Sequence, residues 1–224
     1  MCGRFTLTAP EKEILFEFGL HDLPVDYMPR FNIAPGQNIW SIIHDGERKR
    51  AGLLQWGLIP PWAKDPKIGY KMINARSETA HEKPSFKHSM SKKRCLIIAD
   101  SFYEWKKEKE KKQPVRIFPQ DRKLFAFAGL WEKWKQEEEE RFTCTILTKE
   151  ANEFMGRIHE RMPVILPKSM EEEWIKPVKR DPGEVHQFLE QLTMEDLESY
   201  PVSTLVNSAK NESKDCIRPL TEME

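Results

Sequence analysis

Residues 38–59, NIWSIIHDGERKRAGLLQWGLI, hold the pattern that decides the fold class. Two apolar runs flank the dipeptide Asp45-Gly46. Asp-Gly between such runs is a strong short-range signal for a β-hairpin, because both residues tolerate the backbone conformation of a tight turn. The segment therefore predicts two antiparallel strands that meet at Asp45-Gly46.

Further strand patterns follow the hairpin along the chain. Apolar or alternating runs typical of strands occupy residues 95–100, 102–107, 114–118, 123–132, 141–148, 162–166 and 201–206. The charge-rich segments 106–113 and 133–141 lie between strand patterns and are interpreted as solvated hairpin tips. Strands that follow one another without regularly alternating helices favour an α+β fold around a mostly antiparallel sheet or barrel-like core.

Four segments carry helix signals and are expected to flank that core. In residues 8–20, TAPEKEILFEFGL, Thr8 is the expected N-cap, Glu11 its capping-box partner and Gly19 the end of the helix. The other three segments are residues 150–158, 168–175 and 181–192. Because the first helix follows the N-terminal residues directly, we expect the start of the chain to have a fixed position.

Length and composition indicate one soluble domain. A chain of 224 residues with 39% hydrophobic and 32% charged residues can bury one sizeable core under a charged surface. We expect a domain over residues 1–210, a polar tail over residues 211–224, and a monomer. Neither a membrane span nor a signal peptide is recognised in the sequence, so a cytoplasmic location is expected.

Charge and cysteine content narrow the possible functions. Basic and acidic residues both number 36, which neither indicates nor excludes nucleic acid, because a local basic groove can lie within a neutral total. Cys2, Cys95, Cys144 and Cys216 lie far apart without zinc-ligand spacing, so no metal and no cofactor are expected. Cys95 and Cys144 fall in strand patterns that predict buried, inert thiols, whereas Cys216 lies in the tail and is interpreted as incidental.

Cys2 is the one candidate nucleophile, because the sequence lacks the familiar serine-hydrolase, metalloprotease and phosphate-binding motifs. Removal of Met1 would leave Cys2 with a free α-amine and a thiol on adjacent carbons. The amine is far richer in free base at neutral pH than a lysine amine. It can form a Schiff base with an aldehyde, and the thiol can then close a thiazolidine ring. The alternative is that Cys2 is an ordinary small residue.

Polar residues elsewhere suggest partners for this chemistry. In residues 72–79, MINARSET, Asn74, Arg76 and Glu78 alternate with small residues, as at a strand end, although Asn and Glu could also cap a helix that begins near Ser77. Glu104 stands between two aromatic residues. It is either exposed and without a role, or it lines an apolar cleft that would raise its pKa and make it a general acid or base.

Two further observations leave alternatives open. His159 and Arg161 alternate just before an apolar strand pattern, where a histidine is either structural or catalytic. Aromatic and basic residues adjoin at Trp62, Phe86 and Trp105. Such pairs fit stacking on single-stranded nucleic acid, but amphipathic surface strands produce the same pattern.

Seven segments in series carry a family resemblance: MCGRF, RFNIAPGQ, WGLIPPWAKD, INARSET, ADSFYEWKK, IHERMPVIL and PVSTLVN. Together, from residue 2 to about residue 207, they resemble the SRAP family, the SOS response-associated peptidases. The resemblance implies an SRAP-like α+β domain over residues 1–210 with a DNA-binding channel. It also implies a protein that crosslinks covalently to abasic sites in single-stranded DNA and reaches the nucleoid on damage.

The resemblance also implies roles for individual residues. Cys2 would be the crosslinking nucleophile, Asn74 and Glu104 would hold and protonate the sugar, and His159 would assist ring opening and reversal. Phosphate contacts would come from Arg4, Arg76 and Arg161. The aromatic residue beside the lesion would be Trp62, Phe86 or Trp105, and Pro84 stands where some relatives have arginine.

Two other functions remain open at this stage. One is a thiol peptidase or autopeptidase, with Cys2 as nucleophile and His159 or Glu104 as base. The other is a module that binds single-stranded DNA without a covalent bond.

Overall fold

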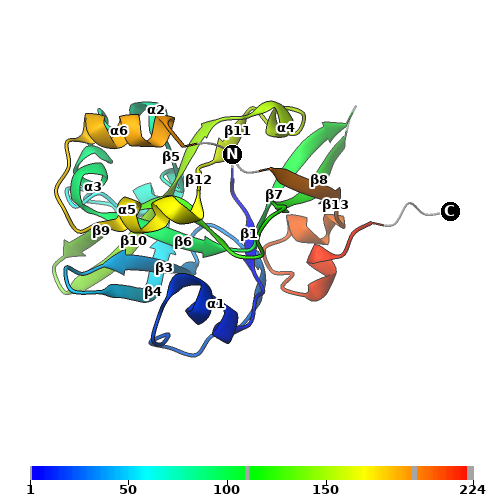
Figure 1. Cartoon of the computed structure of the whole chain (residues 1–224), viewed down its shortest axis with the longest axis horizontal. Coiled ribbons are helices and arrows are strands. Elements are labelled where there is room, and N and C mark those ends of the chain that lie inside the picture. Colours follow the sequence, from blue (N-terminus) through cyan, green and yellow to red (C-terminus); the bar gives the residue numbers. More distant parts are fainter. Residues whose placement is uncertain (1, 109–110, 193–195, 221–224) are drawn as a thin grey trace.

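The computed structural model describes residues 2–108, 111–192 and 196–220, and they form two sheets with short helices around them (Figure 1). The first sheet has the order β13-β8-β7-β1-β2. The second has the order β11-β10-β4-β3-β6-β9-β12, and β5 pairs with β10 outside that path. Because β9 also pairs with β10, strands β10, β4, β3, β6 and β9 close into a barrel-like core. The α+β class with a mostly antiparallel, barrel-like core is therefore confirmed.

The strands have the following bounds: β1 Phe5–Leu7, β2 Arg30–Ile33, β3 Asn38–His44, β4 Lys49–Trp56, β5 Asn74–Arg76, β6 Arg94–Ala99, β7 Ser101–Glu108, β8 Lys111–Pro119, β9 Phe125–Gln136, β10 Glu139–Glu150, β11 Arg161–Pro163, β12 Ile165–Leu166 and β13 Leu197–Pro201. The α-helices are α1 Glu11–Phe18, α2 Ser77–Ala80, α3 Lys87–Lys92, α4 Glu153–Gly156, α5 Glu171–Ile175 and α6 Pro182–Glu190. Four 3-10 helices are η1 Pro66–Lys71, η2 Lys168–Met170, η3 Thr204–Asn207 and η4 Lys214–Ile217. None of these helices is long and apolar enough to cross a membrane.

The hairpin over residues 38–59 forms as predicted, with β3 and β4 antiparallel. The Asp45 carboxylate stabilises the turn by accepting hydrogen bonds from the backbone N–H groups of Glu47 and Arg48, both at 2.9 Å. Gly46 has φ 108°, which favours glycine. The charge-rich segments lie, in their described parts, at the ends of the β7–β8 and β9–β10 hairpins.

The core is built from strands that are buried along most of their length. All six residues of β6 are buried, and Cys95 and Cys144 are fully buried as predicted. Gly129 of β9 lies against Cys95, where an added Cβ would come within 2.7 Å of the sulfur. A larger residue at Gly129 would therefore force the sheet apart.

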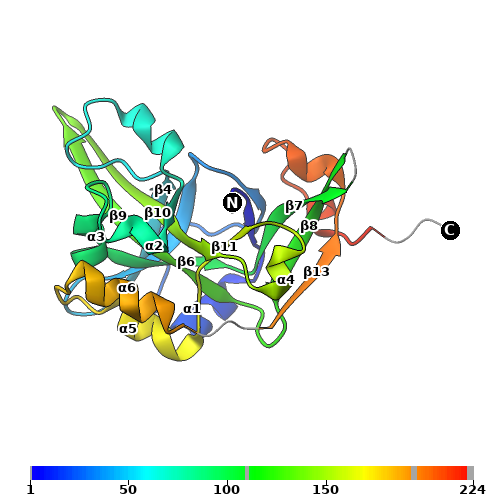
Figure 2. The same cartoon turned by 90° about the horizontal axis from the view of Figure 1, so that it is seen from above.

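Strand β1 holds the start of the chain in the core. Phe5 is fully buried, and its ring centroid lies 5.2 Å from that of Trp56 and 5.8 Å from that of Phe127. The strand pairs with β2 on one side and β7 on the other. The fixed chain start expected from the sequence is thus confirmed for the residues from Cys2 onward. Figure 2 shows this end of the chain lying between the two sheets.

The structure corrects two local predictions. Helix α1 ends at Gly19 as predicted, but it begins after Pro10, and Thr8 does not cap it. The backbone N–H and hydroxyl of Thr8 instead donate to the Asp100 carboxylate. The strand predicted over residues 201–206 is also wrong: β13 ends at Pro201, because the Ser203 hydroxyl accepts from the Leu205 N–H and starts η3.

Residues 211–220 contact the first sheet, although the sequence predicted a polar tail there. The Glu212 carboxylate binds the Arg30 guanidinium at 2.9 Å and accepts from the backbone N–H groups of Phe31 and Asn32. Cys216, which was interpreted as incidental, is fully buried in η4. This segment therefore covers the free side of β2.

Candidate functional site

Cys2 lies fully buried three residues before β1, and its backbone carbonyl accepts a 2.8 Å hydrogen bond from the Asn74 side chain. Burial raises the pKa of the Cys2 thiol well above its usual value, and the nearby charge of Glu104 raises it further. The thiol is therefore protonated at neutral pH. A resting thiolate nucleophile does not fit this environment.

Glu104 lies on β7, and only 3% of its surface is exposed. Its neighbour Tyr103 is fully buried on the other face of the strand, so β7 is covered on both sides here. Burial raises the pKa of the Glu104 carboxyl, while the charge of His159 opposes the shift. Of the two alternatives left by the sequence, the structure therefore supports the buried carboxyl with a raised pKa.

Asn74 reaches the site from β5, which runs parallel to β10. Its amide nitrogen holds the Cys2 carbonyl, whereas its oxygen Oδ1 is buried and, among the described residues, has no hydrogen-bond partner. A buried acceptor without a donor is unfavourable unless a ligand supplies one. Helix α2 begins at Ser77 as the alternative reading proposed, but no side chain caps it.

His159 lies between α4 and β11. Its Nδ1 lies 2.9 Å from the Arg161 backbone nitrogen and 3.2 Å from the Arg161 carbonyl oxygen, so its hydrogen-bond role depends on the tautomer. The ring lies near Glu104, because a positive charge on His159 lowers the pKa of that carboxyl. Cys2, Asn74, Glu104 and His159, which the sequence singled out separately, thus come together from four elements.

The three arginines occupy different environments. Arg76 is exposed at the end of β5. Arg4 is half-buried and donates to the Asn32 side-chain oxygen at 2.7 Å and the Val206 carbonyl at 2.6 Å. Its guanidinium lies 5.8 Å from the centre of the Trp105 ring. Arg76 therefore presents its charge to solvent, whereas Arg4 is held in place by neighbouring groups.

Arg161 is buried and binds Glu78 through two hydrogen bonds of 2.7 and 2.9 Å. Burial opposes ionisation of Glu78, but the hydrogen bonds and charge of Arg161, together with backbone N–H donors, hold the pKa of Glu78 below its usual value. A further bond of 2.9 Å joins Arg161 to the Thr148 carbonyl. The expected phosphate contact of Arg161 stays a prediction, and a phosphate that bound there would share the guanidinium with the Glu78 carboxylate.

The three aromatic candidates differ in exposure. Trp62 is 58% exposed, and Trp105 is half-buried with its indole N–H donating to the Asn207 side chain at 2.7 Å. Phe86 is 7% exposed and packs in the hydrophobic core. The structure corrects the expectation for Phe86, because its ring has no open face on which a base could stack.

Sequence reasoning missed two supporting residues. Asn32 is fully buried, accepts from Arg4 and donates to the carbonyls of Ser208 and Asn211 at 3.0 and 2.8 Å. Asn207 orients Trp105. Both lie inside segments that carried the family resemblance, RFNIAPGQ and PVSTLVN, so their position in those segments was the available signal.

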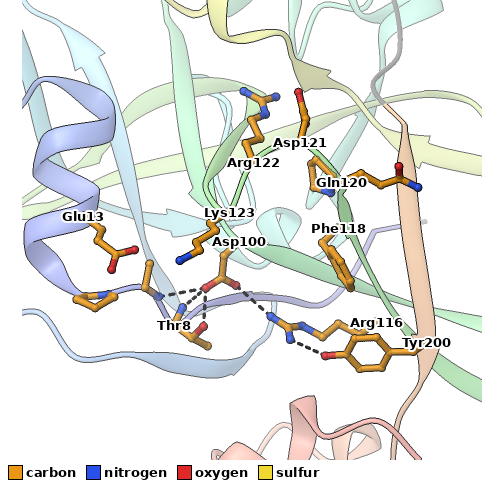
Figure 3. A pocket seen from close by; sticks show the side chains of 13 residues that line it. Thr8, Glu13, Asp100, Arg116, Phe118, Gln120, Asp121, Arg122, Lys123 and Tyr200 are labelled. Atoms are coloured by element: carbon orange, nitrogen blue, oxygen red, sulfur yellow. Dashed lines mark hydrogen bonds and ion pairs between the residues drawn. The ribbon is translucent and has the colours of Figure 1, made fainter.

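A hollow of about 630 Å³ lies elsewhere, and residues from the loop after β1, from β8 and from β13 are among those that line it (Figure 3). None of Cys2, Asn74, Glu104 and His159 lines it. Its polar groups bind one another: Thr8 donates to Asp100, and Arg116 donates to the Tyr200 hydroxyl at 2.6 Å. This hollow is separate from the Cys2 site.

Fold and site together define a class of α+β protein in which a buried cysteine just before the first strand lies beside an amide and a carboxyl, with an imidazole near that carboxyl. The sequence profile of the family described as SOS response associated peptidase (SRAP) matches residues 1–209, and the chain belongs to this family.

Individual relatives agree with this assignment. The abasic site processing protein YoqW of Bacillus subtilis is 52% identical and covers 97% of this chain and 99% of its own. The abasic site processing protein YoaM of the same organism is 51% identical and covers 97% of each. A crystal structure of a protein from Bacteroides thetaiotaomicron, 24% identical, covers 98% of this chain and 100% of its own with a TM-score of 0.85, which shows the same fold.

Proposed function

We propose that this chain senses abasic sites in single-stranded DNA and shields them through a thiazolidine crosslink to Cys2 after Met1 is removed. The relatives named above are abasic site processing proteins, which supports the choice of lesion. The observation that carries the proposal is the meeting of Cys2 with Glu104, a buried carboxyl whose pKa is raised. The four residues that the sequence predicted for this chemistry lie in one site.

The reaction balances without a cofactor. The α-amine attacks the aldehyde of the ring-opened sugar, and the resulting carbinolamine loses water to give a Schiff base. The Cys2 sulfur then adds to the imine carbon, and the thiol proton passes to the nitrogen, which closes the thiazolidine. Because the amine is the first nucleophile, a thiol that stays protonated at rest is compatible with this sequence.

Site residues supply the proton transfers. A carboxyl with a raised pKa stays protonated to higher pH, so Glu104 can protonate the departing oxygen. The Asn74 oxygen can accept a hydrogen bond from a sugar hydroxyl, and the His159 imidazole can donate a proton to the ring oxygen as the sugar opens. Ring closure converts the Schiff base into a thiazolidine. The imine that would promote strand cleavage by β-elimination is then no longer present.

Exposed groups around the site would hold the DNA strand. Arg76 suits a phosphate because its charge faces solvent, and Trp62 suits a base because more than half of its surface is open. Trp105, held by Asn207 and beside Arg4, would border the lesion. A monomer would bind one lesion in this arrangement.

Intact mass spectrometry with a single-stranded oligonucleotide that carries one abasic site tests the proposal. We expect loss of Met1 and a denaturant-resistant one-to-one adduct with the native protein. Cys2→Ser keeps the amine, so it should form only a Schiff base that borohydride traps, and a chain with a blocked N-terminus should form nothing. An adduct from Cys2→Ala that survives without borohydride would refute the thiazolidine.

A thiol peptidase that uses Cys2 is the second candidate, supported by the family description and by the proximity of Cys2 to Glu104 and His159. Its test is turnover of added peptides, because Met1 removal also occurs by general processing. Reversible, salt-sensitive binding without any adduct would instead indicate a non-covalent DNA-binding module.

A further inference from the structure

A basic hollow of about 480 Å³ lies on the helical side of the molecule, between α3 and the segment that leads into α6. It is lined by Lys87, His88, Ser91, Lys179, Arg180, Asp181 and Pro182. None of these residues belongs to the Cys2 site. The Asp181 carboxylate is already engaged, because it accepts from the Gly183 N–H at 2.8 Å at the start of α6.

A buried arginine joins α3 to the segment that precedes the other wall of this basic hollow. The Arg94 guanidinium donates to five backbone carbonyls at distances between 2.7 and 3.1 Å. Two of these carbonyls belong to α3, and the other three belong to Trp174, Lys176 and Val178, in α5 and the segment that follows it. The Ser91 hydroxyl also donates to the Arg180 carbonyl at 2.6 Å. The hollow is therefore preformed.

Positive charge is concentrated around the basic hollow. Burial, followed by the charge of Arg180, lowers the pKa of Arg94 to about 10, so Arg94 remains charged at neutral pH behind the wall. Arg180 forms an ion pair with Glu173, but Lys87 and Lys179 are exposed and have no carboxylate partner among the residues that the structure describes. A small oxyanion placed between the two lysines would gain charge-assisted hydrogen bonds.

Contiguous elements lead from the Cys2 site to the basic hollow. Helix α2 begins directly after Arg76, and His81 at its end stacks on His186 of α6 with 4.4 Å between the ring centroids. Helix α6 also packs against α3. Figure 2 shows α2 between the chain start and the helices that border the hollow.

We propose that the basic hollow binds a backbone phosphate of the same DNA strand at a position beyond the lesion. The proposal rests on the proposed binding of single-stranded DNA. In this proposal Lys87 and Lys179 bind a phosphate. Only a DNA strand long enough to extend from the Cys2 site across α2 and α6 can reach them.

The test measures reversible binding of two strands that carry a tetrahydrofuran abasic analogue, which has no aldehyde and cannot crosslink. One strand has about 8 nucleotides and the other about 30, bracketing the usual site sizes on single-stranded DNA. For the double variant Lys87→Gln/Lys179→Gln we expect about fivefold weaker binding of the long strand. The slope of log affinity against log salt should fall by about 1.4, or about 0.7 for each lost phosphate contact.

The short strand should bind the variant and the native protein equally well. The matched control is Lys12→Gln/Lys123→Gln, which removes two exposed lysines from a hollow on a different part of the surface and should leave both strands unaffected. Equal affinity and equal slope for the long strand in the variant and the native protein would overturn the proposal. Because no covalent bond is measured, a failure of the crosslink would be seen separately, with abasic DNA.

Discussion

The Cys2 site and the large hollow around Asp100 differ in how their polar groups are satisfied. In the hollow, the Asp100 carboxylate accepts from Thr6, Thr8 and the Ala9 N–H, and Arg116 is bound to Tyr200. At the Cys2 site, Asn74 Oδ1 has no described partner, and burial raises the pKa of both Cys2 and Glu104. In the hollow these polar groups already bind one another, whereas the Cys2 site holds a buried acceptor and a carboxyl of raised pKa that a substrate could engage.

The largest expected effect comes from Glu104→Gln. The variant keeps the shape of the side chain but cannot deliver a proton, so the rate of adduct formation should fall by about 10²–10³. Single-turnover kinetics with abasic single-stranded DNA would measure it, and Glu13→Gln at the large hollow is the control. An unchanged rate would show that Glu104 does not take part in adduct formation.

Asp100→Ala should lower the stability of the protein without changing the rate of the reaction. It removes the acceptor for the hydrogen bonds from Thr6, Thr8 and Ala9, which should lower the free energy of unfolding by about 3 kcal/mol. Denaturant unfolding would measure this loss. The adduct rate per folded molecule should equal that of the native protein, and a large fall in that rate would show that the two regions are coupled.

Asn74→Ala should reduce the adduct rate by about tenfold. The variant loses the hydrogen bond that holds the Cys2 carbonyl, worth about 1.4 kcal/mol when it positions a reacting group. Asn38→Ala, at an exposed position on β3, is the matched control. Equal rates for the two variants would mean that strand β1 alone positions Cys2.

The smallest effect concerns pH. Because the pKa of Glu104 is raised in the folded state, the native chain holds the extra proton between the unfolded and folded pKa values. Stability should therefore fall as pH rises from the unfolded pKa through the raised folded value, and the fall should be absent in Glu104→Gln. Parallel pH curves for the variant and the native protein would contradict the shift.

Local signals predicted most of the secondary structure but few of the contacts that complete the site. The β3–β4 hairpin follows from Asp45-Gly46, and α6 follows from its Asp-Pro start, because both depend on neighbouring residues. By contrast, β5 pairs with β10 across a separation of about seventy residues, and that pairing brings Asn74 to Cys2. No local pattern encodes such a pairing.

The same limit applies to single residues. Arg161 binds Glu78, which lies 83 positions earlier in the chain, and no local pattern predicts this partner. Phe86 adjoins lysines in sequence, yet its ring packs in the core. The Thr8 hydroxyl donates to the Asp100 carboxylate and does not cap the start of α1. In each case a distant contact overrides a valid local preference.

The position of Glu212 has a consequence for self-association. An edge strand with free N–H groups can template pairing with another molecule, and β2 is the last strand of its sheet. The Glu212 carboxylate occupies the N–H groups of Phe31 and Asn32, so the segment over residues 211–220 blocks that edge with a charge. A chain shortened after residue 210 should expose it and aggregate more readily on concentration, even though every residue of the candidate site is retained.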